Sequence, residues 1–150
     1  MSLQNLQQTI DQSKANAKGF ARDLFHEAWS AEQVEDFVNA KSSMTVATID
    51  KGGKPHAASV AAGCVDGILY IGVGRRTALL GNLRRGDAVA FTVGGIVVGQ
   101  GTAALRGRSG DMKAIAPQLG AILRGAIEQD WDGYYYAIEP SKVFATGPTD

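Results

Sequence analysis

One short segment of the chain concentrates residue types that bind anions. Arg75, Arg76 and Thr77 follow a strand-like run, and Arg84 and Arg85 come at the end of a short helical pattern. The whole chain has 15 basic and 15 acidic residues, so this cluster stands out against a formal net charge of zero. A guanidinium group offers a planar fork of N–H donors that matches a phosphate. The Arg75–Arg76 pair is therefore the first candidate for a phosphate site.

The position of each residue in this segment allows more than one interpretation. Thr77 stands where a helix N-cap is expected, and the first amides of the helix that it would cap also favour an anion. Arg84 and Arg85 stand at the opposite end, where cations complement the helix dipole. Arg75 and Arg76 could also be a solvated loop pair, or ion-pair partners across a dimer interface. The residues alone leave these alternatives open.

Residues for other kinds of catalytic site are scarce. Cys64 is the single cysteine, which excludes an internal disulfide framework and a multi-cysteine zinc site, and we interpret it as a small buried hydrophobe. The two histidines, His26 and His56, lie far apart and give little support to a histidine metal site. We interpret His56 as a partly exposed residue at a strand start, with a hydrogen bond to a bound ligand as the alternative. No Ser-His-Asp set or carboxylate pair stands out.

Three segments have the apolar spacing of amphipathic helices. The first runs from Leu6 to Trp29. Ser30, followed by a Glu-Gln pair, forms a capping box for a second helix that ends near Asn39. The third covers residues 109–129, with apolar residues three or four positions apart. Residues 1–40 are thus predicted to be an N-terminal helical segment.

Between these helices the period changes to the alternation of β-strands. Five runs, from "SMTVATID" to "IVVGQGTAAL", are separated mainly by glycine-rich turns, and Asp66-Gly67 is a strong hairpin signal. "YYYAIEP" and "KVFAT" add one or two closing strands interrupted by Pro140. Consecutive strands with tight turns indicate antiparallel pairing, and five or six of them close most economically into a small barrel. The predicted fold is α+β, mainly β, in a single domain over residues 1–150.

Composition restricts the expected partners and compartment. With 45% hydrophobic and 20% charged residues the chain is globular, and its zero net charge gives no support to nucleic-acid or anionic-membrane binding. No apolar run approaches the ~18–20 residues that span a bilayer. The N-terminal region lacks the apolar centre of a secretion signal. We expect a soluble cytoplasmic protein.

Four stretches, taken in this order, resemble a known family. They are "MTVATIDKGGKPHAASV", "GILYIGVG", "NLRRGDAVAFTV" and "GQGTAAL", which lie in the region from about Phe37 to Leu105. Together they resemble the pyridoxamine 5′-phosphate oxidase-like proteins, the FMN-binding split β-barrels. The resemblance implies an antiparallel six-stranded split barrel with N-terminal and flanking helices. It also implies a homodimer, with an FMN phosphate in each of two clefts at the interface.

The resemblance implies a set of cofactor-binding residues, with two departures from the family's pattern. The expected set is Ala58, Ser59, Val60, Val73, Gly74, Arg75, Arg76, Thr77 and Trp131. Trp131 is included for its aromatic ring, which could stack on a ligand or else belong to the core or an interface. The family's Ser-Arg-Lys run corresponds to Thr77-Ala78-Leu79, so both cationic positions are lost. An arginine that the second strand often supplies corresponds to Ala58. Because Arg75 and Arg76 lie only a few residues upstream of the lost cations, their long side chains could reach the same phosphate.

The function expected from this resemblance depends on a cofactor. Small residues along the second strand leave room for a flat ligand, or for close packing against another protomer. Since no catalytic side-chain set is evident, the chemistry would belong to the flavin. We expect an FMN-dependent oxidoreductase with a small-molecule substrate that the sequence does not identify, and we do not expect pyridoxamine phosphate oxidation itself. The alternatives are a non-catalytic flavin-, deazaflavin- or haem-binding protein of the same fold, and a scaffold whose cleft is empty.

Overall fold

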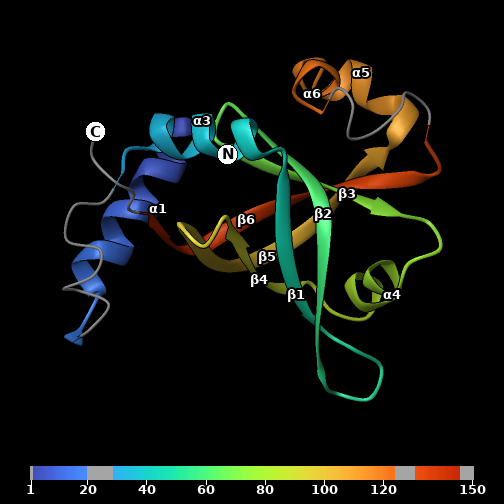
Figure 1. The fold of residues 1–150 in the computed structure, drawn as a ribbon, viewed down its shortest axis with the longest axis horizontal. Helices are drawn as coiled ribbons and strands as arrows, with labels where there is room; N and C mark the ends of the chain where they lie inside the picture. The colour runs from blue at the N-terminus through green and yellow to red at the C-terminus, as the bar shows by residue number, and fades with distance from the viewer. Residues whose placement is uncertain (1, 20–28, 124–130, 146–150) are drawn as a thin grey trace.

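Six antiparallel strands form a closed barrel in the computed structural model, which describes residues 2–19, 29–123 and 131–145 (Figure 1). Around the barrel the strands follow the order β1-β2-β3-β6-β5-β4. They are β1 (Ser43–Ile49), β2 (Pro55–Val65), β3 (Ile68–Gly74), β4 (Ala88–Val93), β5 (Val97–Arg108) and β6 (Gly133–Ala145). The mainly β fold and the antiparallel six-stranded barrel predicted from the sequence are confirmed.

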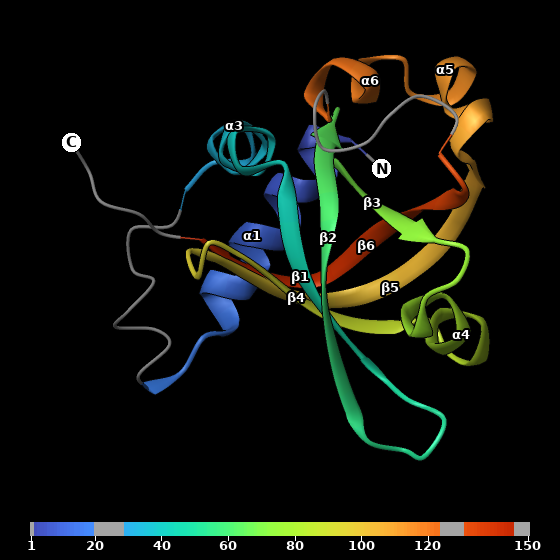
Figure 2. The same ribbon diagram turned by 45° about the vertical axis from the view of Figure 1, so that its right-hand side comes forward.

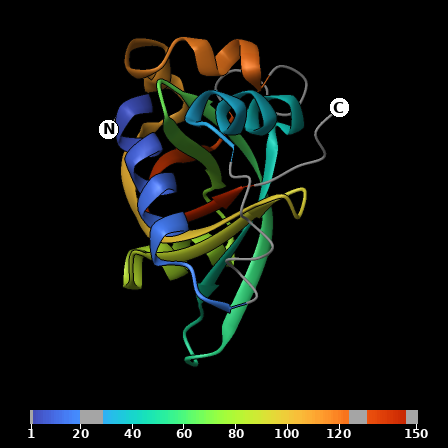
Figure 3. The same ribbon diagram turned by 90° about the vertical axis from the view of Figure 1, so that its left-hand side faces the viewer.

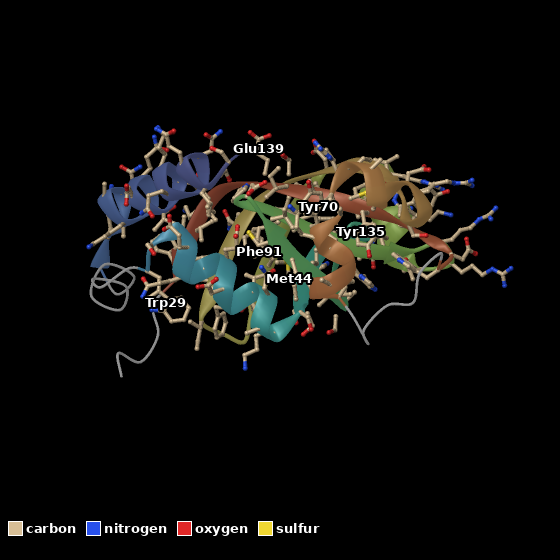
Figure 4. All side chains as sticks on the ribbon, turned by 90° about the horizontal axis from the view of Figure 1, so that it is seen from above. Trp29, Met44, Tyr70, Phe91, Tyr135 and Glu139 are labelled. Atoms are coloured by element: carbon tan, nitrogen blue, oxygen red, sulfur yellow. The ribbon has the colours of Figure 1, made fainter. Side chains whose placement is uncertain are left out.

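The main hydrophobic core fills the barrel and extends to two helices that precede it among the described residues. Alternate strand residues point inward, as Met44 on β1 and Phe91 on β4 do (Figure 4). The helices α1 (Leu3–Asn16) and α3 (Ala31–Lys41) lie across the barrel from α4 (Ala78–Arg85), as Figures 1 and 3 show. Their apolar residues join the same core: Leu6, Ile10, Val34 and Val38. None of the helices in the described ranges is long and apolar enough to cross a bilayer.

The two N-terminal helices agree unequally with their predictions. The capping box of α3 is confirmed, because the Ser30 hydroxyl accepts the Gln33 amide and the Gln33 side chain accepts the Ser30 amide. The first helix is shorter than predicted. It ends at Asn16, where Ala17 turns to extended backbone (φ −67°, ψ 141°). Residues 20–28 of that prediction lie outside the described residues.

The prediction of a single helix over residues 109–129 is wrong. The structure has three short pieces there, η1 (Ser109–Asp111), α5 (Met112–Ile115) and α6 (Gln118–Ile122), and residues 124–130 lie outside the described residues. The helix breaks at Ala116, whose backbone has φ −147° and ψ 77°. The cause is Pro117, since proline has no amide to donate and disfavours helical backbone in the residue before it.

These short helices bury most of the described apolar face that their sequence predicts, although Ile115 is exposed. Met112, Leu119 and Leu123 pack with Tyr70 on β3 and Tyr135 on β6 in a second hydrophobic cluster. α5 and α6 therefore cover the outer surface of the barrel over β3 and β6 (Figures 2 and 4).

α3 is fixed to the β2–β3 hairpin around Cys64. The Asn39 side chain accepts the Cys64 amide at 2.6 Å and donates to its carbonyl at 2.9 Å. The Glu35 carboxylate accepts the Gly67 amide at 2.8 Å and lies 3.5 Å from the Cys64 sulfur. Burial, reinforced by the Glu35 charge, raises the pKa of the Cys64 thiol. Cys64 is confirmed as a buried residue, and the Asp66-Gly67 turn has the positive φ values of the predicted hairpin (53° and 78°).

The closing strand is continuous through Pro140. β6 runs from Gly133 to Ala145, and its register with β5 shifts between Gln100 and Gly101, beside Pro140. A shift of this kind accommodates a residue that cannot donate to the strand ladder. Of the two alternatives left open by the sequence, one or two strands, the structure has one.

Candidate functional site

The barrel is split along one edge of β2. The first half of β2, Pro55–Ala61, pairs with β1, whereas its pairing with β3 begins only at Ala62, opposite Ile71. β3 stays paired with β6 as far as Gly74. From Ala62 toward the β1–β2 hairpin, β2 and β3 therefore part, and α4 lies beside the opening (Figure 2).

A cavity of about 230 Å³ lies in this split. It is lined by His56, Ala58, Ser59 and Val60 on β2, Gly74 on β3, and Thr77, Ala78 and Leu79 at the start of α4. Because most of these side chains are short, the β2 backbone lies close to the cavity. Ligand pockets usually occupy ~300–1,000 Å³, so the cavity in one chain is large enough for only part of a cofactor-sized molecule.

The cavity brings together residues that the sequence placed in the expected cofactor site. Ala58, Ser59, Val60, Gly74 and Thr77 all line it. The signals that found them were the run of small residues on β2, the glycine that ends β3 and, for Thr77, the expected helix N-cap together with the family resemblance.

Arg75 and Arg76 lie at the edge of this cavity, between Gly74 and Thr77, which line it. The Arg75 guanidinium is 3.9 Å from the Asp132 carboxylate, and its amide donates to the Asp132 carbonyl at 3.1 Å. Arg76 is exposed and forms no hydrogen bond or ion pair with the residues that the structure describes. Arg76 is therefore the more available of the two cations for an anionic ligand.

Thr77 is the N-cap of α4, as its position in the sequence suggested. Its hydroxyl accepts the Leu80 amide at 3.3 Å and donates to the Gly74 carbonyl at 2.8 Å. The hydroxyl proton is therefore already used within the turn. The amides of Ala78 and Leu79 belong to the first turn of the helix and have no acceptor within it. A ligand at this end would meet backbone amides first and the Thr77 hydroxyl second.

The second arginine pair lies at the far end of α4, as predicted. The Arg84 guanidinium stands over the Tyr134 ring, 5.6 Å from its centroid. Arg85 donates to the side chain of Asn82, which in turn donates to the Thr48 hydroxyl at 3.0 Å. Arg84 contacts the barrel directly, whereas Arg85 is linked to it through Asn82.

Four residues of the expected set do not line the cavity: Arg75 and Arg76, which lie at its edge, and Val73 and Trp131. Val73 is fully buried and points into the barrel core. Trp131 packs edge-on against Tyr135, with ring centroids 5.7 Å apart, in the cluster beneath α5 and α6.

His56 is a cavity residue outside the expected set. It lines the cavity, and its Nδ1 is buried with no hydrogen-bond partner in the part of the chain that the structure describes. A buried polar atom of this kind costs about 1–3 kcal/mol when it stays unpaired, so it calls for a partner. Its position at the start of β2, after Pro55, was the only signal in the sequence.

No side-chain set for metal binding accompanies the cavity. Across the described ranges no group of three or more His, Cys, Asp or Glu residues could hold a metal ion. What the cavity offers instead is a small-residue wall, a helix N-terminus, an imidazole and a nearby guanidinium.

One part of the outer barrel surface is nearly free of charge. Strand register places Ala57, Ala47, Ala90 and Gln100 in one row, and Ser59, Thr45, Thr92 and Val98 in the next. These eight residues, which we call the bare face, are all exposed or half-buried. An antiparallel sheet that faces water usually carries polar and charged residues on that side, so the bare face has the composition of a contact surface.

Several solved structures have a similar fold. The haem storage protein HutZ from Vibrio cholerae is 14% identical over 76% of this chain and 92% of its own, with a TM-score of 0.57. An F420 reductase is 13% identical over 73% of this chain and 94% of its own, with a TM-score of 0.56. A protein from Clostridium acetobutylicum is related to general stress protein 26 and belongs to the pyridoxinephosphate oxidase family. It is 12% identical over 77% of this chain and 92% of its own, with a TM-score of 0.54. These similarities concern the fold.

The sequence itself matches one family model. The model described as pyridoxamine 5′-phosphate oxidase matches residues 30–143, a range that contains every residue lining the cavity. No curated protein matches the chain. Since the matched range covers most of the sequence and the barrel is the one that the resemblance implied, the chain belongs to the pyridoxamine 5′-phosphate oxidase family.

Proposed function

We propose that the protein binds FMN in the split between β2 and β3 and acts as an FMN-dependent oxidoreductase on a small-molecule substrate. The observation that carries this proposal is the cavity. The small residues of β2 line one side of it, and the N-terminus of α4 lines another. A flat ring needs a wall without bulky side chains, and a phosphate needs N–H donors. The cavity provides both.

The α4 side of the cavity fits a phosphate. The Ala78 and Leu79 amides lie in the first turn of α4, where they have no acceptor within the helix. The helix dipole also favours an anion at this end. Arg76 can add a charge-assisted hydrogen bond from the edge of the cavity. Arg75 is placed to contribute less, because its guanidinium lies beside the Asp132 carboxylate.

The β2 side of the cavity fits the polar edge of a flat ring. Backbone groups alternate between the two edges of a strand, and the Ala62 amide donates to Ser42, toward β1. The amides and carbonyls of Ser59 and Ala61 therefore face the split, where β3 no longer pairs with them. Bound FMN would supply the electron- and hydride-transfer chemistry, while these groups hold and orient it.

We also propose that two copies of the chain pair through the bare face and complete the site. The cavity in one chain is smaller than a usual cofactor pocket, and Ser59 belongs to both the cavity and the bare face. A second copy on that face would cover the open side of the cavity. Depletion of charged residues is typical of interface centres, and stable homodimers commonly bury about 2,000 Å² or more.

Titration of the purified protein with FMN, followed by flavin fluorescence and absorbance, tests the proposed ligand. We expect saturable binding of FMN, and weaker binding of riboflavin, which lacks the phosphate. Absence of binding at high micromolar FMN would contradict the proposal, and so would equal affinity for both flavins.

Haem is the second candidate, because His56 places an imidazole in the cavity and imidazole is a common haem ligand. The similar fold of a haem storage protein supports this alternative. A haem Soret band that shifts in His56→Ala, together with no flavin binding, would favour haem over FMN. The similar fold of an F420 reductase supports a deazaflavin in the same cavity, which would compete with FMN in the titration.

A further inference from the structure

We infer that His56 supplies the β2 contact to the phosphate of bound FMN, through Nδ1. This inference rests on the proposed function and adds a ligand-contacting residue to it.

The first argument is the state of the imidazole. His56 lines the cavity, and its Nδ1 is buried but has no hydrogen-bond partner among the described residues. Most buried polar atoms in native structures have a partner. A ligand group in the cavity would supply the missing one.

The second argument is the position of His56 along the split. Ala62 pairs with Ile71 in an antiparallel register. Each residue before Ala62 on β2 is therefore level with the corresponding residue after Ile71 in the chain. If that register is extended through the split, His56 comes level with Thr77, the N-cap of α4. Both residues line the same cavity. His56 therefore faces the end of α4 where the helix amides favour an anion.

The third argument is the lack of any other side-chain donor on the face of β2 that His56 shares with Ala58 and Val60. Ala58 and Val60 point to the same side of β2 as His56, because side chains two residues apart share a face. Neither Ala58 nor Val60 has a polar side-chain atom. An imidazole N–H can donate to a phosphate oxygen in a charge-assisted hydrogen bond.

Substitution of His56 tests this role with FMN and riboflavin as a matched ligand pair. We expect His56→Phe, which keeps a ring but loses Nδ1, to weaken FMN binding about ten- to a hundredfold. Riboflavin affinity should change by less than about twofold, since only the phosphate contact is lost. His56→Asn places an amide nitrogen near the position of Nδ1 and should recover most of the FMN affinity.

A rescue variant and a control strengthen the test. Ala58→Arg in the His56→Phe background places a guanidinium on the same face of β2 and should restore FMN binding. Lys54→Ala removes an exposed charge two residues from His56 and should leave both affinities unchanged. Circular dichroism and thermal melting confirm that each variant is folded.

The possible outcomes separate this inference from the proposed function. If the parent protein binds no FMN, the proposed function fails and the inference falls with it. If the parent binds FMN and folded His56→Phe binds it equally well, the inference alone is wrong. An equal loss for FMN and riboflavin would also overturn it, because His56 would then contact the ring and not the phosphate.

Discussion

Placing arginine at both Ala47 and Ala90 is expected to convert the proposed dimer into a monomer and to weaken its FMN binding at the same time. The two residues are direct cross-strand neighbours on β1 and β4, within the bare face. In a two-fold symmetric dimer each substitution occurs twice. Burying charges without partners costs several kcal/mol. A loss of about 1.4 kcal/mol in binding free energy raises the dissociation constant tenfold. We therefore expect dimer dissociation to become easier by a factor of roughly a hundred or more.

Light scattering at micromolar protein concentration measures this effect through the molar mass of the parent and of the variant. Ala121→Arg is the matched control, because Ala121 is an exposed residue of α6 outside the bare face. It should change neither the mass nor FMN binding. A parent protein that is a monomer would contradict the proposed dimer. A folded double variant that remains a dimer would place the interface elsewhere.

Removing the side chain of Arg76 is expected to weaken FMN binding by about ten- to a hundredfold, because a charge-assisted hydrogen bond contributes roughly 1.5–3 kcal/mol. Riboflavin binding should change little, since riboflavin has no phosphate to contact. Arg75→Ala should have a smaller effect than Arg76→Ala, because the Arg75 guanidinium already lies beside Asp132. Added salt should weaken FMN binding to the parent in part, since Arg76 is exposed and its charge is screened.

Arg84→Ala provides the control for this series of fluorescence titrations. Arg84 is also exposed and belongs to the same helix, but its guanidinium lies over Tyr134 at the other end. It should leave FMN affinity nearly unchanged. If folded Arg76→Ala binds FMN as tightly as the parent, the phosphate does not lie at the start of α4.

Most of the fold could be predicted because its signals are local. Alternating apolar residues and tight turns give the strands, and the Ser30 capping box gives the start of α3. The failures occurred where tertiary packing or a single residue outweighed the periodicity. Residues 109–129 keep a helical spacing of apolar residues, but Pro117 divides them. The closing strand passes Pro140 because its register with β5 shifts there, leaving Ser141 of β6 without a paired residue on β5, and the sequence gives no local signal of this shift.

The candidate site could be predicted in part for the same reason. The small residues of β2 and the segment from Gly74 to Thr77 were found because their types are unusual for their positions. The opening between β2 and β3 depends on where their pairing begins, so the sequence could not show that His56 joins this cavity. Trp131 packs with Tyr135 under the short helices, a contact set by the position of those helices over β6.

Mapping of backbone amide chemical shifts during an FMN titration tests the central claim most directly, because it locates the ligand. We expect the largest changes in two segments that are distant in sequence, residues 56–60 on β2 and residues 74–79 from the end of β3 into α4. Amides in the polar groove between α1 and β6, lined by Gln12 and Glu139 among others, should stay unchanged. Changes concentrated in that groove, or none at saturating FMN, would contradict a flavin site in the split barrel.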